Sequence, residues 1–217
     1  MSQISKAILR TIAYADIFDY PLRQSEIWRF LISKIQIPKS KFQKNLDLLS
    51  LQVANQNDVY FLKGREKIVA LRQKREEWSR PKMTIARRVA GRLKLIPTVK
   101  MVAVTGALAM NNADRNDDID LLIVTGRNRL WLTRLLTIFL VELVAKRRRP
   151  NDKVVANKIC LNMFLDEDCL AVPQNEQDLF SAHEVCQLRL LWDKNNCYQK
   201  FIKANLWSQK FLANWKP

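Results

Sequence analysis

The sequence is short of glycine, histidine and acidic side chains, and each shortage narrows the possible functions. Only 4 of the 217 residues are glycine, which argues against a glycine-rich β protein and against flexible linkers. The single histidine, His183, has no metal-spaced partner, so we expect it to pack or to form hydrogen bonds rather than to catalyse. A chain of this length can still form one large domain or two small ones with apolar cores.

Cysteine is present but not in a pattern that binds metal or forms a disulfide framework. The chain has no CxxC pair and no cluster of cysteine with histidine, so a structural zinc site is not expected. Met1–Arg10 lacks the apolar core of a signal peptide. We therefore expect a cytoplasmic protein with four free thiols, at Cys160, Cys169, Cys186 and Cys197.

Apolar residues form no run long enough for a membrane span. The longest candidate, Leu130–Ala145, is shorter than the ~20 residues that a spanning helix needs, and it contains Arg134 and Glu142. Because "KRRRP" follows it, the run is typical of a buried helix with a basic C-terminal end. We expect no membrane partner.

Basic residues are in large excess. The chain has 37 lysines and arginines against 21 aspartates and glutamates, a net charge of +16. Such a balance favours polyanionic partners, namely nucleic acid, nucleotides or an anionic membrane surface. More than half of the surplus lies in residues 63–94, which contain twelve basic and three acidic residues.

Residues 1–64 show the order of a winged helix-turn-helix domain, three short helices followed by a two-stranded wing. The spacing of apolar residues predicts helices over Ile4–Asp16, from a cap at Ser25 to Leu31, and over Phe42–Leu49. Two strand-like runs surround the turn Asn55–Asp58.

Residues 65–96 are expected to form a basic connector of two helices divided at Pro81, and residues 97–217 to alternate strands and helices before a helical tail. The expected strands are Val99–Thr105, Ile119–Thr125 and Lys158–Leu165, and the expected helices are Ala107–Met110, Leu130–Lys146 and the tail Leu179–Trp215. This order predicts an α/β (α+β) protein, with a small mixed sheet and helices behind the winged helix.

Two carboxylates stand one residue apart at the start of the second expected strand. Side chains alternate along a strand, so Asp118 and Asp120 share one face while Ile119 and Leu121 point to the other. Such a pair suits Mg²⁺, which takes carboxylate and phosphate oxygens; the pair could equally be solvated charges at a strand end. Upstream, Gly106 lies where a strand passes into a helix, a place where backbone N–H groups can hold phosphate.

These residues carry a resemblance. "VTGALAM" followed by "DDIDLLIVT" resembles the signature of the DNA polymerase beta-like nucleotidyltransferase superfamily: an apolar strand, Gly-Ser or Gly-Gly, a short spacer, Asp-x-Asp in a second strand, and a third carboxylate on a later strand. The match covers Val99–Thr125. The wider layout also resembles bacterial nucleotidyltransferase-domain proteins with an N-terminal winged helix.

The resemblance implies a Mg²⁺-dependent enzyme that moves a nucleoside monophosphate from a nucleoside triphosphate to an acceptor hydroxyl. Gly106 and Ala107 would then lie at the triphosphate, and Asp118 and Asp120 would bind the metal. Ala107 stands where the family has a second glycine or a serine, and the third carboxylate is not evident. In the expected third strand Asn162 cannot act as a base, so Asp166, which keeps the same strand phase, is our candidate third catalytic residue.

Several basic residues are candidates for binding anions. Arg88 and Arg92 lie one helical turn apart and, with Arg87, could face nucleic acid or a triphosphate. Arg134, within an apolar helix, needs an anionic partner, which could be the triphosphate, Glu142 or a structural aspartate. In the third helix, a DNA recognition helix and a charged solvent face both fit Lys41 and Lys44.

Two functions remain open from the sequence. One is the Mg²⁺-dependent nucleotidyltransferase, with a nucleoside triphosphate as substrate. The other is a degenerate, catalytically weak nucleotidyltransferase fold that serves as a nucleotide- or nucleic-acid-binding regulatory module. Either could contact nucleic acid through the connector or the winged helix, and the sequence leaves the oligomeric state open.

Overall fold

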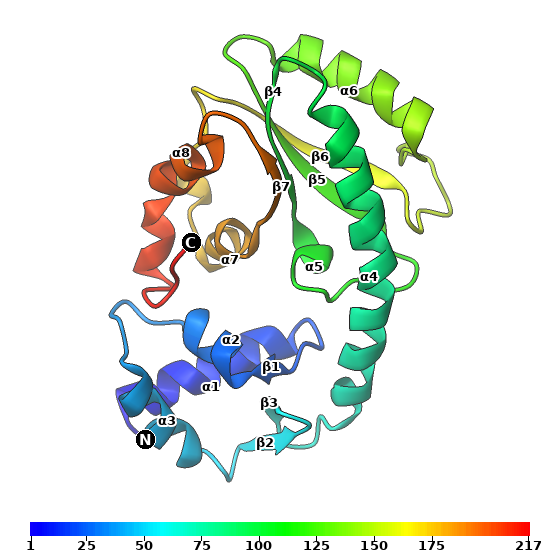
Figure 1. The fold of residues 1–217 in the computed structure, drawn as a ribbon. Helices are drawn as coiled ribbons and strands as arrows, with labels where there is room; N and C mark the ends of the chain where they lie inside the picture. Colours follow the sequence, from blue (N-terminus) through cyan, green and yellow to red (C-terminus); the bar gives the residue numbers. More distant parts are fainter. The chain divides into compact units, whose positions relative to one another are not determined.

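The computed structural model describes all 217 residues as a mixed α+β protein with two β-sheets (Figure 1). The chain divides into two compact units. Unit 1 contains Met1–Lys74, Gln174–Cys186 and Leu206–Pro217, and unit 2 contains Arg75–Pro173 and Gln187–Asn205. We expected residues 97–217 to form one domain, but parts of its C-terminal tail belong to each of the two units.

Unit 1 combines helices with a three-stranded antiparallel sheet of order β1-β3-β2. Its N-terminal elements are α1 (Gln3–Asp16), β1 (Leu22–Arg23), α2 (Gln24–Arg29), α3 (Lys39–Asp47), β2 (Val53–Gln56) and β3 (Val59–Leu62). Most of α7 (Leu179–Gln187) and the short 3-10 helices η1 (Gln174–Glu176) and η2 (Leu206–Lys210) also belong to this unit. The three helices and the hairpin expected here are present; β1 is an additional strand, too short to leave a pattern in the sequence.

The second helix differs from its prediction at both ends. The sequence places its cap at Ser25, but Arg23 is the N-cap residue, and its backbone N–H donates to Glu26 Oε2 at 2.6 Å. The helix ends at Arg29, and Phe30 and Leu31 are buried beyond it. The apolar spacing therefore predicted the buried residues correctly, but the helix is shorter than it predicted.

The hairpin turn is tighter than predicted. β2 and β3 pair up to Gln56 and Val59, so only Asn57 and Asp58 form the turn. Both have left-handed backbone angles, with φ of 51° and 61°. Asparagine and aspartate tolerate this conformation, and it matches the twist of a two-residue hairpin.

A single helix, α4 (Lys67–Leu93), replaces the two predicted helices, with Pro81 inside it. Proline removes one backbone donor and disfavours the turn before it. Here the helix continues because Met83, Ala86 and Val89 beyond Pro81 are buried in the core of unit 2. Tertiary packing has outweighed the local preference of proline.

The start of α4 is fixed within unit 1 by a buried ion pair. Arg72 is only 3% exposed, and its guanidinium donates to both carboxylate oxygens of Glu26, at 2.8 and 2.9 Å. It also lies over the ring of Tyr20, 4.5 Å from the centroid. One charge of the basic connector is thus a structural contact rather than a free cation.

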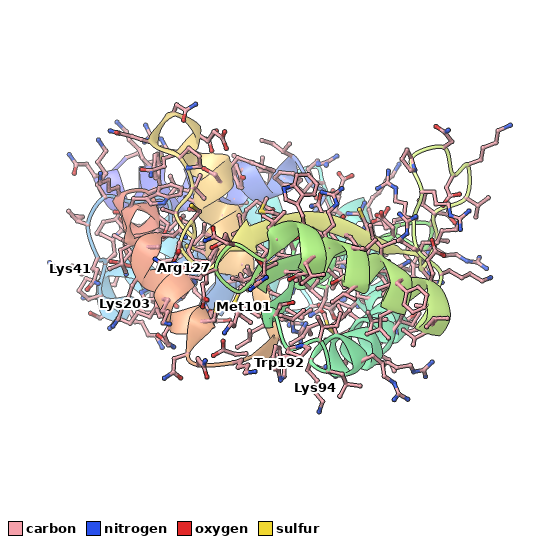
Figure 2. The ribbon with its side chains drawn as sticks, turned by 90° about the horizontal axis from the view of Figure 1, so that it is seen from above. Lys41, Lys94, Met101, Arg127, Trp192 and Lys203 are labelled. Atoms are coloured by element: carbon pink, nitrogen blue, oxygen red, sulfur yellow. The ribbon has the colours of Figure 1, made fainter.

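Unit 2 contains a four-stranded sheet of order β6-β5-β4-β7, in which β5 and β6 are parallel and the other pairs antiparallel. The strands are β4 (Val99–Val104), β5 (Ile119–Thr125), β6 (Ile159–Asp166) and β7 (Arg189–Asp193), and the helices are α5 (Gly106–Ala109), α6 (Leu130–Val144) and α8 (Cys197–Ala204). The sequence predicted a helical tail and missed β7. Trp192 of this strand packs, partly buried, against the core shared with α4 (Figure 2).

The two faces of this sheet have different coverings. Val102 and Val104 of β4 and Leu121 of β5 join the core with α4. α8 packs against β4 and β7. The alternation along β5 therefore places Ile119 and Leu121 toward the α4 core and Asp120 on the opposite face.

Helix α6 is not the buried helix that its composition predicted. Its buried residues are Thr133, Thr137 and Val141, one stripe at a spacing of four that lies toward the sheet, and the helix packs against β6. Most of its large apolar side chains are exposed, including Trp131 at 77% and Phe139 at 65%. Strand β6 is the edge of the sheet, so one side of α6 is enough to cover it.

No helix in the protein is both long and apolar enough to span a lipid bilayer. The four cysteines are free, as expected.

Candidate functional site

Two carboxylates and a thiol converge at the start of the parallel strand pair. Asp118 directly precedes β5, Asp120 is its second residue, and Cys160 is the second residue of β6. One oxygen of each carboxylate and the Cys160 sulfur all lie within 4.8 Å of one another. Parallel pairing places Asp120 opposite Cys160, which accounts for this convergence. We call these three residues the acidic cluster.

Cys160, and neither Asn162 nor Asp166, is the β6 residue that lies beside the two carboxylates. Its thiol is hydrogen bonded to Asp120. Burial, followed by this hydrogen bond and by the charge of Asp120, raises the pKa of Cys160 to about 12. In the metal-free protein the thiol is therefore protonated at neutral pH and donates to the carboxylate, so it is not poised to act as a base.

The electrostatics of Asp120 are those of a buried acid beside another acid. Burial is the main cause that raises the pKa of its carboxyl above the ordinary value, and the charge of Asp118 adds to it. The Cys160 hydrogen bond and the charge of Arg148 act in the opposite direction. A bound cation would relieve both the burial of charge and the repulsion between the carboxylates.

Arg148 pairs directly with the acidic cluster. Its Nη1 donates to Asp118 Oδ2 at 2.6 Å. The backbone holds it there, because its N–H donates to the carbonyl of Ile159 at 2.8 Å, beside an isolated bridge between Arg147 and Ile159. The guanidinium thus neutralises a carboxylate that a metal ion would otherwise bind.

The loop that leads into Asp118 is tied to α4 by a buried lysine. Lys82 is 1% exposed, and its ammonium donates to the carbonyls of Arg115 and Asp117, at 3.1 and 2.6 Å, and to Asn157 Oδ1 at 3.0 Å. Burial lowers the pKa of this lysine. The three contacts fix the backbone at the residue before Asp118.

Gly106 lies against the acidic cluster from the other strand. It follows β4, opens the four-residue helix α5 and has a left-handed φ of 62°. A side-chain carbon at this position would lie 3.2 Å from Asp120 Oδ2. Glycine therefore gives backbone and carboxylate a close approach that another residue would obstruct. Ala107, the next residue, is exposed.

Asp166, our candidate third catalytic residue, is not part of the cluster. It pairs with Thr125, so it lies at the opposite end of the β5–β6 pair from Asp120. Its oxygens accept from the backbone N–H groups of Asn128 at 2.7 Å and Asp168 at 3.0 Å. A register shift between Asp120 and Leu122 also places Asp166 on the opposite face of the sheet from Asp120, because its partner Thr125 alternates with Asp120 along β5. The strand phase was therefore misleading for the face as well as for the position along the strand. Asn162 is exposed and also lies outside the cluster.

Arg134 is exposed rather than buried, and its partners are aromatic. Its guanidinium lies over the rings of Trp131 and Phe164, 5.9 and 5.6 Å from their centroids. Glu142, the alternative partner suggested by the sequence, pairs instead with Arg147 and Arg149. Arg134 does line a pocket beside Cys160, together with these arginines.

The remaining candidates lie outside the cluster. The three connector arginines and the two lysines of α3 are exposed and form no ion pair: Arg87, Arg88, Arg92, Lys41 and Lys44. His183 is buried and stacks on Tyr14, with ring centroids 4.4 Å apart, and burial lowers the pKa of its imidazole to about 4. This is the packing role expected for it.

Sequence reasoning missed three residues of this site. Lys82 falls on the buried stripe of α4, four residues before Ala86 and seven before Val89, and a lysine in an apolar stripe was a usable signal. Arg148 and Cys160 gave no such signal, because only the register of β6 brings them to Asp118 and Asp120.

The residues fit one hard divalent cation better than a full catalytic metal pair. Two carboxylates with substrate phosphates are a usual Mg²⁺ environment. To bind the cation as well, the Cys160 thiol would have to lose the proton that it holds in the metal-free protein, and the cation would have to displace Arg148 from Asp118.

Comparisons with known proteins leave the family open. No protein-family model and no curated protein matches this sequence. Among solved structures, one described as "Crystal structure of the toxin-antitoxin with AMP-PNP" is similar to 57% of this chain and 89% of its own, with 13% identity and a TM-score of 0.30. A TM-score this low does not establish a common fold.

Proposed function

We propose that this protein binds a nucleoside triphosphate and one Mg²⁺ ion at Gly106, Asp118 and Asp120, and that it transfers nucleotide weakly or not at all. The observation that carries the proposal is the acidic cluster itself. Two carboxylates converge there beside a close-approach glycine, which supports binding, and Cys160 takes the third place, which argues against efficient transfer.

The binding half of the proposal rests on charge and geometry. Asp118 and Asp120 would hold the cation, which supplies positive charge for the phosphate oxygens. Gly106 would allow the phosphates to approach the backbone next to Asp120. Lys82 holds the loop before Asp118, so the carboxylates are positioned in advance.

The weak-transfer half rests on proton chemistry. Transfer to a hydroxyl requires a group that takes its proton. The Cys160 thiol has a pKa of about 12 and already donates to Asp120, so it holds its proton at neutral pH. Asp166, the other candidate base, lies at the far end of the strand pair.

We further propose that the N-terminal part of unit 1 is a winged helix. The element order α1, β1, α2, α3, β2, β3, with β1 added to the hairpin sheet, supports this interpretation. The exposed Lys41 and Lys44 of α3 leave a DNA-binding role open to experiment.

The test is nucleotide binding to the full chain across the four ribonucleoside triphosphates, by calorimetry with and without Mg²⁺. We expect saturable, Mg²⁺-dependent binding that Asp118→Asn and Asp120→Asn each weaken by about tenfold or more. Asp166→Asn is the matched control, because it removes a carboxylate from the other end of the same strand pair, and we expect it to bind normally.

Pyrophosphate release in the same samples separates the two functions. We expect release near the background rate. Steady release that disappears in Asp120→Asn would restore the enzyme interpretation, and binding indifferent to Mg²⁺ and to both aspartate variants would overturn the proposal altogether.

A further inference from the structure

A pocket lined by arginines opens beside the acidic cluster in unit 2. Its volume is about 260 Å³. Its walls come from α6, from the segment 147–150 and from the start of β6, and they consist of Arg134, Ile138, Arg147, Arg148, Arg149, Pro150, Cys160 and Leu161. Four arginines among the eight lining residues set this pocket apart from a general basic surface.

The carboxylates near this pocket leave one of its arginines without a carboxylate partner. Glu142 accepts from Arg147 at 2.9 Å and from Arg149 at 3.3 Å, and Asp118 accepts from Arg148 at 2.6 Å. Arg134 lies over two aromatic rings and pairs with no carboxylate. Asp120 also acts on Arg148 through its charge, and Asp152 on Arg149, although Asp152 is itself paired with Lys158. Arg134 is therefore the cation of the pocket that has no carboxylate partner, and it favours an anionic ligand.

The chemistry and size of the pocket select the anion. Arginine presents a planar fork of donors that matches two phosphate oxygens at once. Pockets for whole small molecules usually begin near ~300 Å³, so this one suits a phosphate or diphosphate group rather than a complete nucleotide. We propose that the arginine pocket binds the phosphate group of a second ligand, distinct from the nucleotide at Gly106.

One residue joins this pocket to the acidic cluster. Arg148 lines the pocket while its guanidinium holds Asp118, and Cys160 belongs to both places. A phosphate in the pocket competes with Asp118 for Arg148. Once Arg148 turns to the phosphate, Asp118 is free to bind a cation, so the two ligands strengthen each other's binding. This coupling rests on the proposed function; the binding of phosphate does not.

Phosphate binding is tested first, on the full chain with a chelator present so that no divalent cation contributes. Inorganic phosphate and pyrophosphate are titrated by calorimetry. We expect saturable binding that Arg134→Gln weakens by about tenfold. Arg88→Gln is the matched control, because Arg88 is exposed, forms no ion pair and lies outside the pocket. Equal weakening by both variants would show general attraction to positive charge and would overturn the proposal.

The source of the phosphate is resolved by competition. Oligonucleotides with and without a terminal phosphate are used to displace bound phosphate. Stronger displacement by the phosphorylated strand assigns the pocket to a nucleic-acid end, whereas displacement by small phosphate compounds alone assigns it to a free metabolite. Equal displacement by both oligonucleotides, unaffected by Arg134→Gln, would contradict a phosphate-specific pocket.

The coupling is tested with Mn²⁺, followed by electron paramagnetic resonance without nucleotide, and with sulfate as the phosphate mimic. We expect sulfate to raise Mn²⁺ affinity about fivefold in the wild type. Arg148→Gln should bind Mn²⁺ tightly without sulfate and lose the response. An unchanged Mn²⁺ affinity in sulfate, with pocket binding intact, would overturn the coupling. Absence of Mn²⁺ binding in every variant, with phosphate binding intact, would contradict the proposed function and the coupling that rests on it, and would leave the phosphate pocket standing.

Discussion

The two ends of the β5–β6 pair both carry acidic residues, yet they are built differently. At one end Asp118 and Asp120 converge with Cys160, half-buried, and repel each other. At the other end Asp166 accepts hydrogen bonds from backbone N–H groups, and Asp168 pairs with Arg127. The carboxylates of the first end share one half-buried place, whereas at the second end Asp166, Glu167 and Asp168 each have an N–H or guanidinium donor of their own. Convergence and burial, rather than the number of carboxylates, mark the candidate site.

The largest expected difference between the two ends is the loss of stability on replacing their lysines, Lys82 and Lys100. Lys82→Met removes three hydrogen bonds, including the one to the Arg115 carbonyl, and leaves the Asp117 carbonyl with only the Asn157 N–H as donor, so we expect it to lower the free energy of unfolding by about 3 kcal/mol. Lys100→Met, near the other end of β5, should change it by less than about 0.5 kcal/mol. Urea denaturation of both variants provides the measurement, and equal losses would mean that Lys82 does not anchor the site.

A second contrast comes from adding a carboxylate at either end. Cys160→Asp would complete a three-carboxylate cluster, and we expect it to raise affinity for Mn²⁺ by about tenfold while lowering stability without metal. Cys169→Asp adds the same group at an exposed position near Asp166 and should do neither. Cation titrations with a thermal unfolding readout measure both effects. If the two variants behave alike, the acidic cluster is not a cation site.

The glycines that follow β4 and β5, Gly106 and Gly126, offer a smaller contrast. Gly106→Ala forces a left-handed residue and brings a methyl group within 3.2 Å of Asp120 Oδ2, so we expect a loss of about 1–2 kcal/mol in unfolding free energy. At Gly126 the closest atom to an added methyl would be Lys100 Cε, at 3.1 Å, the end of a flexible side chain that can move. Gly126→Ala should therefore cost less, and chemical denaturation of the pair decides the order.

The smallest predicted effect concerns whether a substitution raises or lowers the free energy of unfolding. Asp120 holds its proton more tightly folded than unfolded, so this group stabilises the fold less as pH rises from below 3.8 through its raised pKa. Asp120→Asn should accordingly increase stability at neutral pH, and the gain should vanish in acid below 3.8. Asp166→Asn should lower stability by up to about 1 kcal/mol, because its carboxylate accepts backbone hydrogen bonds. Unfolding measured across pH compares them, and a loss of stability for both would contradict this difference.

The sequence was a good guide wherever the determinant is local. The alternation of Ile119, Asp120 and Leu121 defined β5 and its inner face, and Gly106 marked the end of β4. The order of helices and hairpin in unit 1 was also readable. These features depend on side-chain periodicity and on backbone conformation, which neighbouring residues set. The metal and nucleotide roles assigned to the same residues remain predictions.

The sequence failed wherever the determinant is a pairing between distant segments. Nothing local indicates that Cys160, rather than Asn162 or Asp166, faces Asp120, because the strand register decides it. β7 looked like part of a helical tail, and its strand conformation comes from pairing with β4. The exposure of α6 likewise follows from its place against an edge strand.

The parallel pairing of β5 and β6 also has a consequence for folding kinetics. Asp120 and Cys160 are neighbours only after the chain has crossed from one strand to the other through α6. Such a connection must close a long loop before its contacts form, which makes parallel pairs slow to assemble. The acidic cluster is therefore expected to be among the last parts of unit 2 to form. A ligand that binds the acidic cluster would contact residues of both strands, and we expect it to slow the unfolding of unit 2.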